Sequence, residues 1–410
     1  MTKFVNKILE KIVGISKSQR KFILEVLKIR LIGHGKMNFR NMSRYSSYNE
    51  KTISRNHEQP FNFAEFNGHA VSEIITKDTR SVAAYDASFI KKSGKKTEGI
   101  GYFWDGSNNK AEKGLEIGCL AVIDVDNNTA YAISAEQTIS NAESSKDIAE
   151  KTRIDAYLKH ASDHKKYLPM NVGHLVGDGF FAKEKFVKGV KSVGLEFVGK
   201  LRIDANLRYL YEGPQKDKGR PKKYDSKVDI EDLTKLDFVK TILDESGEEV
   251  RIYTKLVYCI FLKMTIRIAF LLKSKDKKRI ATAILFTTDL ALQSSDIYAF
   301  YKARYQIEFL FRDAKQFTGL NDCQARTKEK LNFHFNVSFS ALNIVKIEDH
   351  LNQKEYNSKN SFSMASWKRI YSNEHFIHKV FSMFEFDLSL IKSTPHFEEL
   401  RNYGTISNVT

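Results

Sequence analysis

The sequence predicts a mixed α/β fold in which a sheet-forming centre lies between helical regions at the two ends of the chain. Three observations predict it. Residues 1–75 show helical periodicity, apolar runs of strand length alternate with helical patterns from 76 to 203, and helical patterns prevail again from 288 onward. A β-rich stretch from 204 to 287 interrupts this order.

The composition is that of a packed, basic protein. Of 410 residues, 42% are hydrophobic, 28% are charged and only 5 are proline, which excludes a disordered chain. The formal net charge of +16 favours a polyanionic partner, either nucleic acid or acidic lipid, with a basic enzyme lacking such a partner as the alternative. The length suggests two or three domains.

Neither a membrane span nor an oxidising compartment is indicated. The three cysteines are scattered without CxxC spacing, so they support neither a zinc site nor a disulfide framework. The most apolar stretch, 256–272, contains Lys263 and Arg267 and is too short and too charged to span a bilayer. The N-terminus has no signal-peptide pattern. We therefore expect a cytoplasmic protein without a membrane partner.

Residues 1–75 form a basic, helical region. Residues 1–60 hold 13 Lys and Arg against 4 Glu and no Asp, and Phe22, Val26 and Ile29 fall on one helical face. Within 37–57, two short helices around a turn would form a helix-turn-helix, whose second helix would enter the major groove. We expect this region to bind DNA, and a plain helical bundle is the alternative.

Residues 76–203 are expected to form a mixed sheet with helices packed on it. The predicted strands are 82–89, 99–104, 115–125, 129–136, 172–176 and 195–201, and the predicted helices are 146–164 and 182–193. A hairpin turn of Asp and Asn residues is predicted at 126–128, between the third and fourth strands.

The β-rich stretch 204–287 is either an inserted subdomain or an extension of the sheet, with strands at 251–261, 264–272 and 281–287. It contains a basic loop, 216–223, in which five of eight residues are Lys or Arg beside Gly and Pro. We expect this loop to contact DNA phosphates, with a merely solvated loop as the alternative. The expected contacts are Lys218, Arg220, Lys222 and Lys223.

Helices are predicted for the rest of the chain. Residues 288–350 contain a helix from 295 to about 317 and another from 328 to about 350. Residues 351–410 contain weaker helical pieces near 362–384 and form a candidate region for dimerisation.

The predicted helix at 295–317 carries a polar stripe. Four polar residues fall on one face at 100° per residue: Tyr301, Arg304, Glu308 and Lys315. The Glu can ligate a hard cation, and the Arg and Lys can hold phosphate oxygens. The alternative is a solvated face with salt bridges at helical spacing.

Two aspartates strengthen the first interpretation. Asp86 lies inside an apolar strand, where a carboxylate is costly unless it is paired or bound to metal. Asp178 follows an apolar strand between two glycines, at a strand end that faces the ligand crevice in α/β sheets. A structural Asp and a turn Asp are the respective alternatives. Asp124 and Asp126 are rival carboxylates whose Asn-rich surroundings favour a turn role.

Taken together, these residues resemble the DDE transposases of bacterial insertion sequences, specifically the branch with a Y-x2-R-x3-E-x6-K signature. Tyr301, Arg304, Glu308 and Lys315 match the signature at every spacing. Segments 86–94 and 176–181 look like the blocks around the first and second Asp, and Asp289 occupies the place of a Thr-Asp step before the Glu helix. The resemblance covers roughly residues 35–345 and leaves the two ends of the chain unassigned.

The resemblance implies a ribonuclease-H-like catalytic core with a β insertion between Asp178 and Glu308. It implies an enzyme whose Asp86, Asp178 and Glu308 hold two Mg²⁺ ions, with Mn²⁺ as a substitute, for phosphoryl displacement. Arg304 and Lys315 would clamp the DNA backbone, and Tyr301 would stack or hydrogen-bond near the DNA end.

The implied function is cut-and-paste transposition in the bacterial cytoplasm, at the nucleoid. Double-stranded DNA, as transposon ends and target, would be the partner, and a homodimer would form the synaptic complex. Two alternatives remain: a catalytically inactive DNA-binding derivative that acts as a repressor, and a structure-specific nuclease on the same fold.

Overall fold

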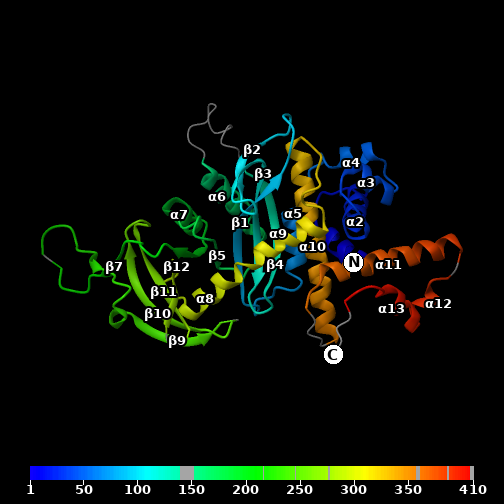
Figure 1. The fold of residues 1–410 in the computed structure, drawn as a ribbon. Coiled ribbons are helices and arrows are strands. Elements are labelled where there is room, and N and C mark those ends of the chain that lie inside the picture. The colour runs from blue at the N-terminus through cyan, green and yellow to red at the C-terminus, as the bar shows by residue number, and fades with distance from the viewer. Residues whose placement is uncertain are drawn as a thin grey trace.

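One long mixed sheet, with helices packed along it, runs through the molecule (Figure 1). The computed structural model describes residues 1–138, 152–215, 217–244, 246–275, 278–356, 361–385 and 387–406. Within these residues, twelve strands form the sheet, in the order β2-β3-β1-β5-β6-β12-β11-β10-β7-β8, with β4 paired to β3 and β9 to β10. The prediction of a mixed α/β fold is therefore confirmed.

The first half of the sheet combines antiparallel and parallel pairing. Its strands are β1 (Ser81–Lys91), β2 (Gly101–Asp105), β3 (Lys110–Asp124), β4 (Thr129–Gln137), β5 (His174–Val176) and β6 (Glu196–Leu201). Strand β1 runs antiparallel to β3 and parallel to β5, and β5 runs parallel to β6. All six strands predicted for this part of the chain exist, with bounds shifted by a few residues, and the turn at 126–128 is present.

The second half continues the same sheet. Its strands are β7 (Leu207–Leu210), β8 (Tyr224–Lys227), β9 (Asp237–Leu243), β10 (Glu249–Cys259), β11 (Met264–Lys275) and β12 (Lys278–Thr287). Strand β12 pairs antiparallel with β6, from Ile284 opposite Leu201 to Thr287 opposite Val198. Of the two alternatives for 204–287, an extended sheet is the one observed.

Helices before the sheet form a group, of which α2 and α5 pack on a long helix that follows the sheet. They are α1 (Thr2–Lys11), α2 (Lys17–Ile32), α3 (Phe39–Met42), α4 (Glu50–Asn56) and α5 (Phe63–Val71), and the long helix is α10 (Lys328–Tyr356). The predicted apolar face of α2 is buried. Arg30 of α2 is fully buried and donates to the carbonyl oxygen of Thr318 and to Ser338 Oγ of α10.

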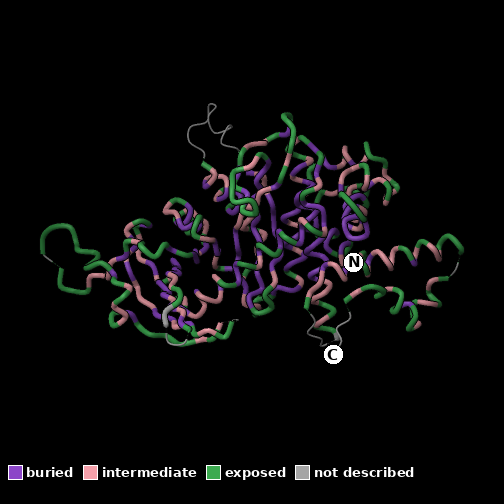
Figure 2. Tube along the Cα trace, in the orientation of Figure 1, coloured by how far each residue is buried: buried purple, intermediate pink, exposed green. Residues whose placement is uncertain are grey.

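Side chains of α10 hydrogen-bond to the free edge of strand β4. Asn336 Oδ1 accepts from the Ala135 amide and Asn336 Nδ2 donates to its carbonyl, and Asn343 makes the same pair of bonds with Ala132. Unpaired backbone groups at a sheet edge would otherwise invite pairing with another chain. Figure 2 shows that burial is concentrated here, in the central strands and the helices beside them.

The remaining helices follow the sheet strands or end the chain. They are α6 (Arg153–His164), α7 (Glu184–Ser192), α8 (Ser294–Ala303), α9 (Gln306–Phe317), α11 (Met364–Met383), α12 (Ser389–Lys392) and α13 (Pro395–Arg401), with 3₁₀ turns at Ser43–Tyr45, Lys165–Tyr167 and Leu233–Lys235. The helix predicted from 146 begins at Arg153, and residues 146–151 lie outside the described residues. In the described parts of the chain, no helix is long and apolar enough to cross a membrane.

The single helix predicted from 295 to 317 is wrong, because the chain breaks between α8 and α9. The amides of Tyr305, Ile307 and Glu308 each bond to a carbonyl only three residues earlier, so the turn around 304–305 tightens to 3₁₀ geometry. No Pro or Gly marks this break in the sequence. The four stripe residues are therefore distributed over two helices and a turn, and their convergence depends on packing.

Candidate active site

Asp86 occupies the point where β1 emerges from the core. The strand is buried from Ser81 to Tyr85 and partly exposed from Asp86 to Phe89. The Asp86 side chain is 21% exposed, and its Oδ1 accepts a 2.8 Å bond from the Ala87 amide. Since side chains alternate along a strand, Asp86 faces away from Tyr85, whose hydroxyl bonds to His160 of α6. Asp86 therefore points to the opposite face of the sheet.

Asp178 occupies the equivalent position beside the neighbouring parallel strand. Ala84 of β1 is in register with Val176 of β5, and each aspartate comes two residues later. Asp178 Oδ1 accepts from the Phe180 amide at 2.9 Å, which holds the turn after β5. A Cβ on Gly177 would lie 2.9 Å from that of Phe181, so glycine permits this tight turn. The two carboxylates are thus brought together by strand register.

Glu308 comes from the first turn of α9, which packs across β1. Its Oε1 accepts a 3.0 Å ion-pair bond from Arg304 Nη2, and Arg304 Nη1 lies 4.0 Å from Asp86 Oδ2. The Arg304 side chain is only 7% exposed, and its guanidinium lies over the Tyr301 and Tyr305 rings. One buried cation therefore links the helical and the strand carboxylates.

The shifted pKa of Asp86 reflects its burial and the proximity of the three acids. Burial raises the pKa of Asp86 to about 7, its bond from the Ala87 amide opposes the rise, and the charges of Asp178 and Glu308 add to it. Arg304 compensates only in part. Clustered carboxylates with a raised pKa are typical of sites that bind a cation or transfer protons.

The donor set fits a hard divalent cation. It consists of three carboxylates without Cys or His, the ligand type that Mg²⁺ and Mn²⁺ prefer. The three carboxylates are not a closed single-ion cage, because only Glu136, His160 and His164, among the described residues, form a set whose ligand atoms all lie within 4.8 Å of one another. An open set of acids leaves room for more than one ion and for substrate oxygens.

The other stripe residues lie around these acids with structural partners of their own. Lys315 Nζ donates to Ser88 Oγ at 2.8 Å and to the Phe89 carbonyl at 3.0 Å, which ties α9 to β1. Burial lowers the pKa of Lys315. Tyr301 is partly buried beneath Arg304. The structure thus assigns Lys315 a contact to the Asp86 strand that the helical spacing did not predict.

The rival aspartates lie in other surroundings. Asp124 Oδ1 accepts from the Asn127 amide and its Oδ2 from the Asn127 side chain, so it holds the turn as expected. Asp126 is exposed in the same turn and pairs with Arg80. Asp289 Oδ2 lies 3.0 Å from His174 Nε2, at the start of β5.

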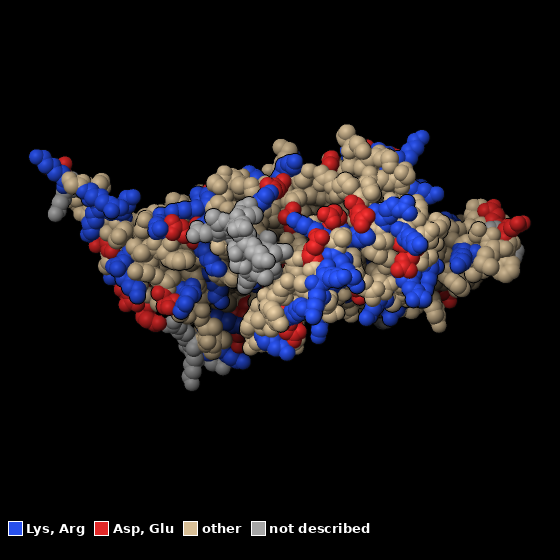
Figure 3. All heavy atoms as spheres, turned by 90° about the horizontal axis from the view of Figure 1, so that it is seen from above, with Lys and Arg blue, Asp and Glu red and all other residues tan. Residues whose placement is uncertain are grey.

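The basic loop projects from the far end of the sheet. Residues 217–223, between β7 and β8, are exposed, and Lys216 lies outside the described residues. Lys222 Nζ lies 4.3 Å from the centre of the Tyr211 ring and 3.2 Å from Asp225 Oδ1. Figure 3 shows Lys and Arg side chains dominating this projecting end of the molecule.

A second basic feature, which the sequence reasoning missed, is a surface cleft beyond the end of β1. Its cationic lining residues are Lys36, Lys91, Lys92, Lys95, Lys96 and Arg326, with Asp322 as an acidic one. The run of four lysines within 91–96 was a visible signal. The cleft lies past the end of the strand that carries Asp86, since Lys91 is the last residue of β1.

Comparison with known proteins identifies a family for this chain. A family model described as a transposase DDE domain matches residues 77–344, well over half of the chain. The match includes Asp86, Asp178 and Glu308. Among curated proteins, no match was found.

Proposed function

Because the chain belongs to the transposase DDE domain family, we propose that it binds the ends of an insertion sequence, cleaves the DNA by metal-dependent phosphoryl transfer and joins the ends to target DNA. The observation that carries the proposal is the convergence of Asp86, Asp178 and Glu308. Asp86 on β1 and Asp178 just after β5 each stand two residues past a pair of residues in register on these parallel strands, and Glu308 comes from a helix packed on β1.

We propose a ribonuclease-H-like catalytic core formed by residues 76–203 and 288–350, with 204–287 as its β-rich insertion. The strand order β4-β3-β1-β5-β6, antiparallel on one side of β1 and parallel on the other, supports it. The spacing of Tyr301, Arg304, Glu308 and Lys315 supports assignment to the Y-R-E-K branch. Residues 1–75 would bind DNA, and 351–410 would contribute to a synaptic homodimer.

In the proposed reaction, Asp86, Asp178 and Glu308 would hold two Mg²⁺ ions, for which Mn²⁺ could substitute. When bound, the metal would provide activation of the oxygen nucleophile and charge stabilisation of the leaving oxygen. The chain's own contribution is to keep Asp86 and Asp178 side by side through strand register and to aim Glu308 through Arg304. A bound cation would also favour the charged form of Asp86, whose pKa is raised by burial and further by the charges of Asp178 and Glu308.

Tyr301, Arg304 and Lys315 are proposed to act on the DNA end beside the acids. Arg304 bonds to Glu308, and it is free to share its guanidinium with a phosphate once a cation neutralises that acid. Lys315 keeps one end of α9 on β1 while presenting its charge near the same strand. The lysine-rich cleft beyond β1 would continue the path of the DNA backbone.

The basic loop yields a prediction on salt dependence. Replacing Lys218, Arg220, Lys222 and Lys223 together by Gln is expected to reduce the slope of log K against log[salt] for DNA binding. The slope falls by about 0.9 for every phosphate that the variant no longer neutralises. The measurement is DNA affinity as a function of salt.

A matched control removes the same charge elsewhere. Lys354, Arg369, Lys379 and Lys392 are exposed on the C-terminal helices, and their joint replacement by Gln also removes four positive charges. If the two quadruple variants change the slope equally, the loop acts only through net charge and the proposed phosphate contacts are wrong.

The function itself is tested on DNA that carries the genomic sequences flanking the gene. The protein, Mg²⁺ and a target plasmid are incubated and the products are sequenced. We expect free transposon ends and ends joined to the target. Binding without cleavage would identify a DNA-binding derivative acting as a repressor, and cleavage without joining would identify a nuclease on the same fold.

A further inference from the structure

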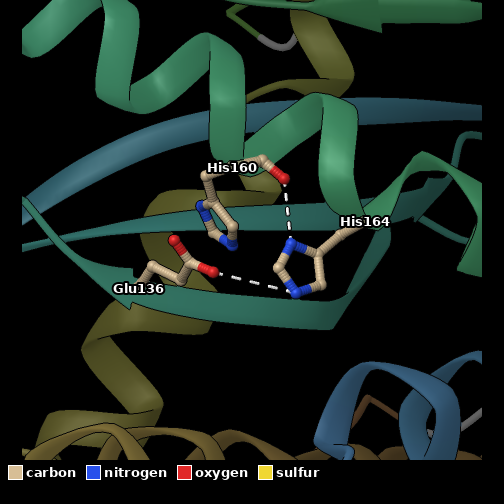
Figure 4. A group of neighbouring side chains, drawn as sticks. All are labelled: Glu136, His160 and His164. Carbon is tan, nitrogen blue, oxygen red and sulfur yellow. Dashed lines mark hydrogen bonds and ion pairs between the residues drawn. The ribbon is translucent and has the colours of Figure 1, made fainter.

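On the opposite face of the sheet from Asp86, three metal-ligating side chains lie together (Figure 4). His160 and His164 stand one turn apart on α6, and Glu136 comes from the end of β4. The ligand atoms of the three lie within 4.8 Å of one another. Two His at positions i and i+4 on a helix, with a carboxylate facing them, is a spacing that suits a single metal ion.

The hydrogen bonds of His164 orient it for metal binding. Its Nδ1 lies 2.9 Å from the His160 carbonyl oxygen, which can only accept, so Nδ1 carries the hydrogen. In the neutral ring, Nε2 then presents a lone pair, and this atom faces Glu136 Oε1 at 3.8 Å. These two acceptors face each other across a gap that a metal ion would bridge.

His160 is fixed by a second bond of the kind that orients metal ligands. Its Nδ1 lies 2.9 Å from the Tyr85 hydroxyl, and its Nε2 lies 3.1 Å from Ser134 Oγ. If Nε2 exchanged its Ser134 partner for a metal, Nδ1–H would donate to Tyr85, because outer partners of ligating His residues commonly accept. Burial lowers the pKa of His160 well below its ordinary range, which keeps the ring in the neutral, ligating form.

The site is accessible and adjustable. Ser134, Glu136 and His164 line a surface cleft, which provides an entry path and room for a water ligand. The Glu136 side chain is 46% exposed, so it can rotate toward the two rings. Some movement of this kind is needed, because zinc bonds of about 2.0–2.2 Å place the ligand atoms of a tetrahedral site about 3.4 Å apart.

We propose that Glu136, His160 and His164 form an open binding site for a zinc-class divalent transition metal, with water as the fourth ligand. Its ring nitrogens favour zinc over the magnesium that the all-carboxylate site prefers. The metal would fasten α6 to β4. Through Tyr85, it would also brace β1 directly behind Asp86. The proposal concerns metal content and stability, and it does not depend on the proposed DNA chemistry.

The test measures zinc binding by the full chain after chelation and dialysis. The background carries Asp86→Asn, Asp178→Asn and Glu308→Gln, so that the carboxylate site cannot contribute. We expect one equivalent of Zn²⁺ to bind, to raise the Tm, and to be replaceable by Co²⁺ with the visible absorption of a four-coordinate site. His164→Ala and Glu136→Gln, both at partly exposed positions, should each weaken zinc affinity at least about tenfold.

His378→Ala is the matched control, since His378 also faces a glutamate one turn away, Glu374 at 4.0 Å, with no place in the Glu136 cluster. This variant should keep the full equivalent of zinc. If the background protein binds zinc no more tightly than the His164→Ala variant, the cluster is not a zinc site and the proposal is wrong.

Discussion

Asp86→Asn, Asp178→Asn and Glu308→Gln are each expected to abolish DNA cleavage and end joining while leaving DNA binding nearly unchanged. Each substitution keeps the side-chain shape and removes one anionic ligand. A bound metal contributes several kcal/mol of charge stabilisation, so the loss should reach about a thousandfold or more. The measurement is the rate of cleaved and joined product in Mg²⁺, beside DNA affinity in Ca²⁺.

Folding should survive these changes. Burial and the neighbouring acids raise the pKa of Asp86 to about 7, so its charged form destabilises the metal-free protein as the pH rises from the unfolded value near 4 toward 7. Asp86→Asn removes that penalty, and its Tm at pH 8 should be no lower than that of the wild type. Asp126→Asn, in an exposed turn, is the matched control and should retain full activity. A triad variant that cleaves at the wild-type rate would remove that residue from the ligand set.

Arg304→Gln is expected to reduce joined product by about ten- to a hundredfold, more than it reduces DNA affinity. Arg304 bonds to Glu308 and lies beside Asp86 in a nearly buried position, so its loss releases the helical acid and leaves repulsion uncompensated. A charge-assisted bond contributes roughly 1.5–3 kcal/mol, which corresponds to this range of rates. Binding to paired ends and product yield are measured on the same preparation.

Lys315→Met tests whether Lys315 positions α9 on β1 or contacts DNA. Since Lys315 bonds to Ser88 and to the Phe89 carbonyl, its loss should lower the Tm along with the yield. Arg304→Lys keeps the charge without the two-pronged geometry and should restore only part of the activity. Wild-type yield from both Arg304→Gln and Lys315→Met would mean that the four-residue stripe has no part in the reaction.

The sequence was sufficient for features that depend on local pattern. Apolar runs predicted β1 and β4 near their observed bounds and most of β3, because strands buried on both faces carry consecutive apolar residues. Asp86 could be recognised from the sequence because it is a carboxylate within an apolar run. Helical periodicity also found α2 and its buried face.

Tertiary contacts decided what local pattern could not show. The break between α8 and α9 has no Pro or Gly signal. At this break, Arg304 packs beneath Tyr305 and bonds to Glu308. Helical periodicity at 100° per residue does not predict these contacts. Likewise, only pairing of β12 with β6 decided that 204–287 extends the sheet.

By itself, the sequence determined the order of the chemistry along the chain: an acid in a strand, an acid after a strand, and an acid in a helix beside two bases. The tertiary structure alone decided that strand register sets Asp86 beside Asp178, that Lys315 is tied to β1, and that Glu136 meets His160 and His164. The reason is physical. Local periodicity specifies which face of an element is buried, whereas contacts between elements depend on how buried faces pack in three dimensions.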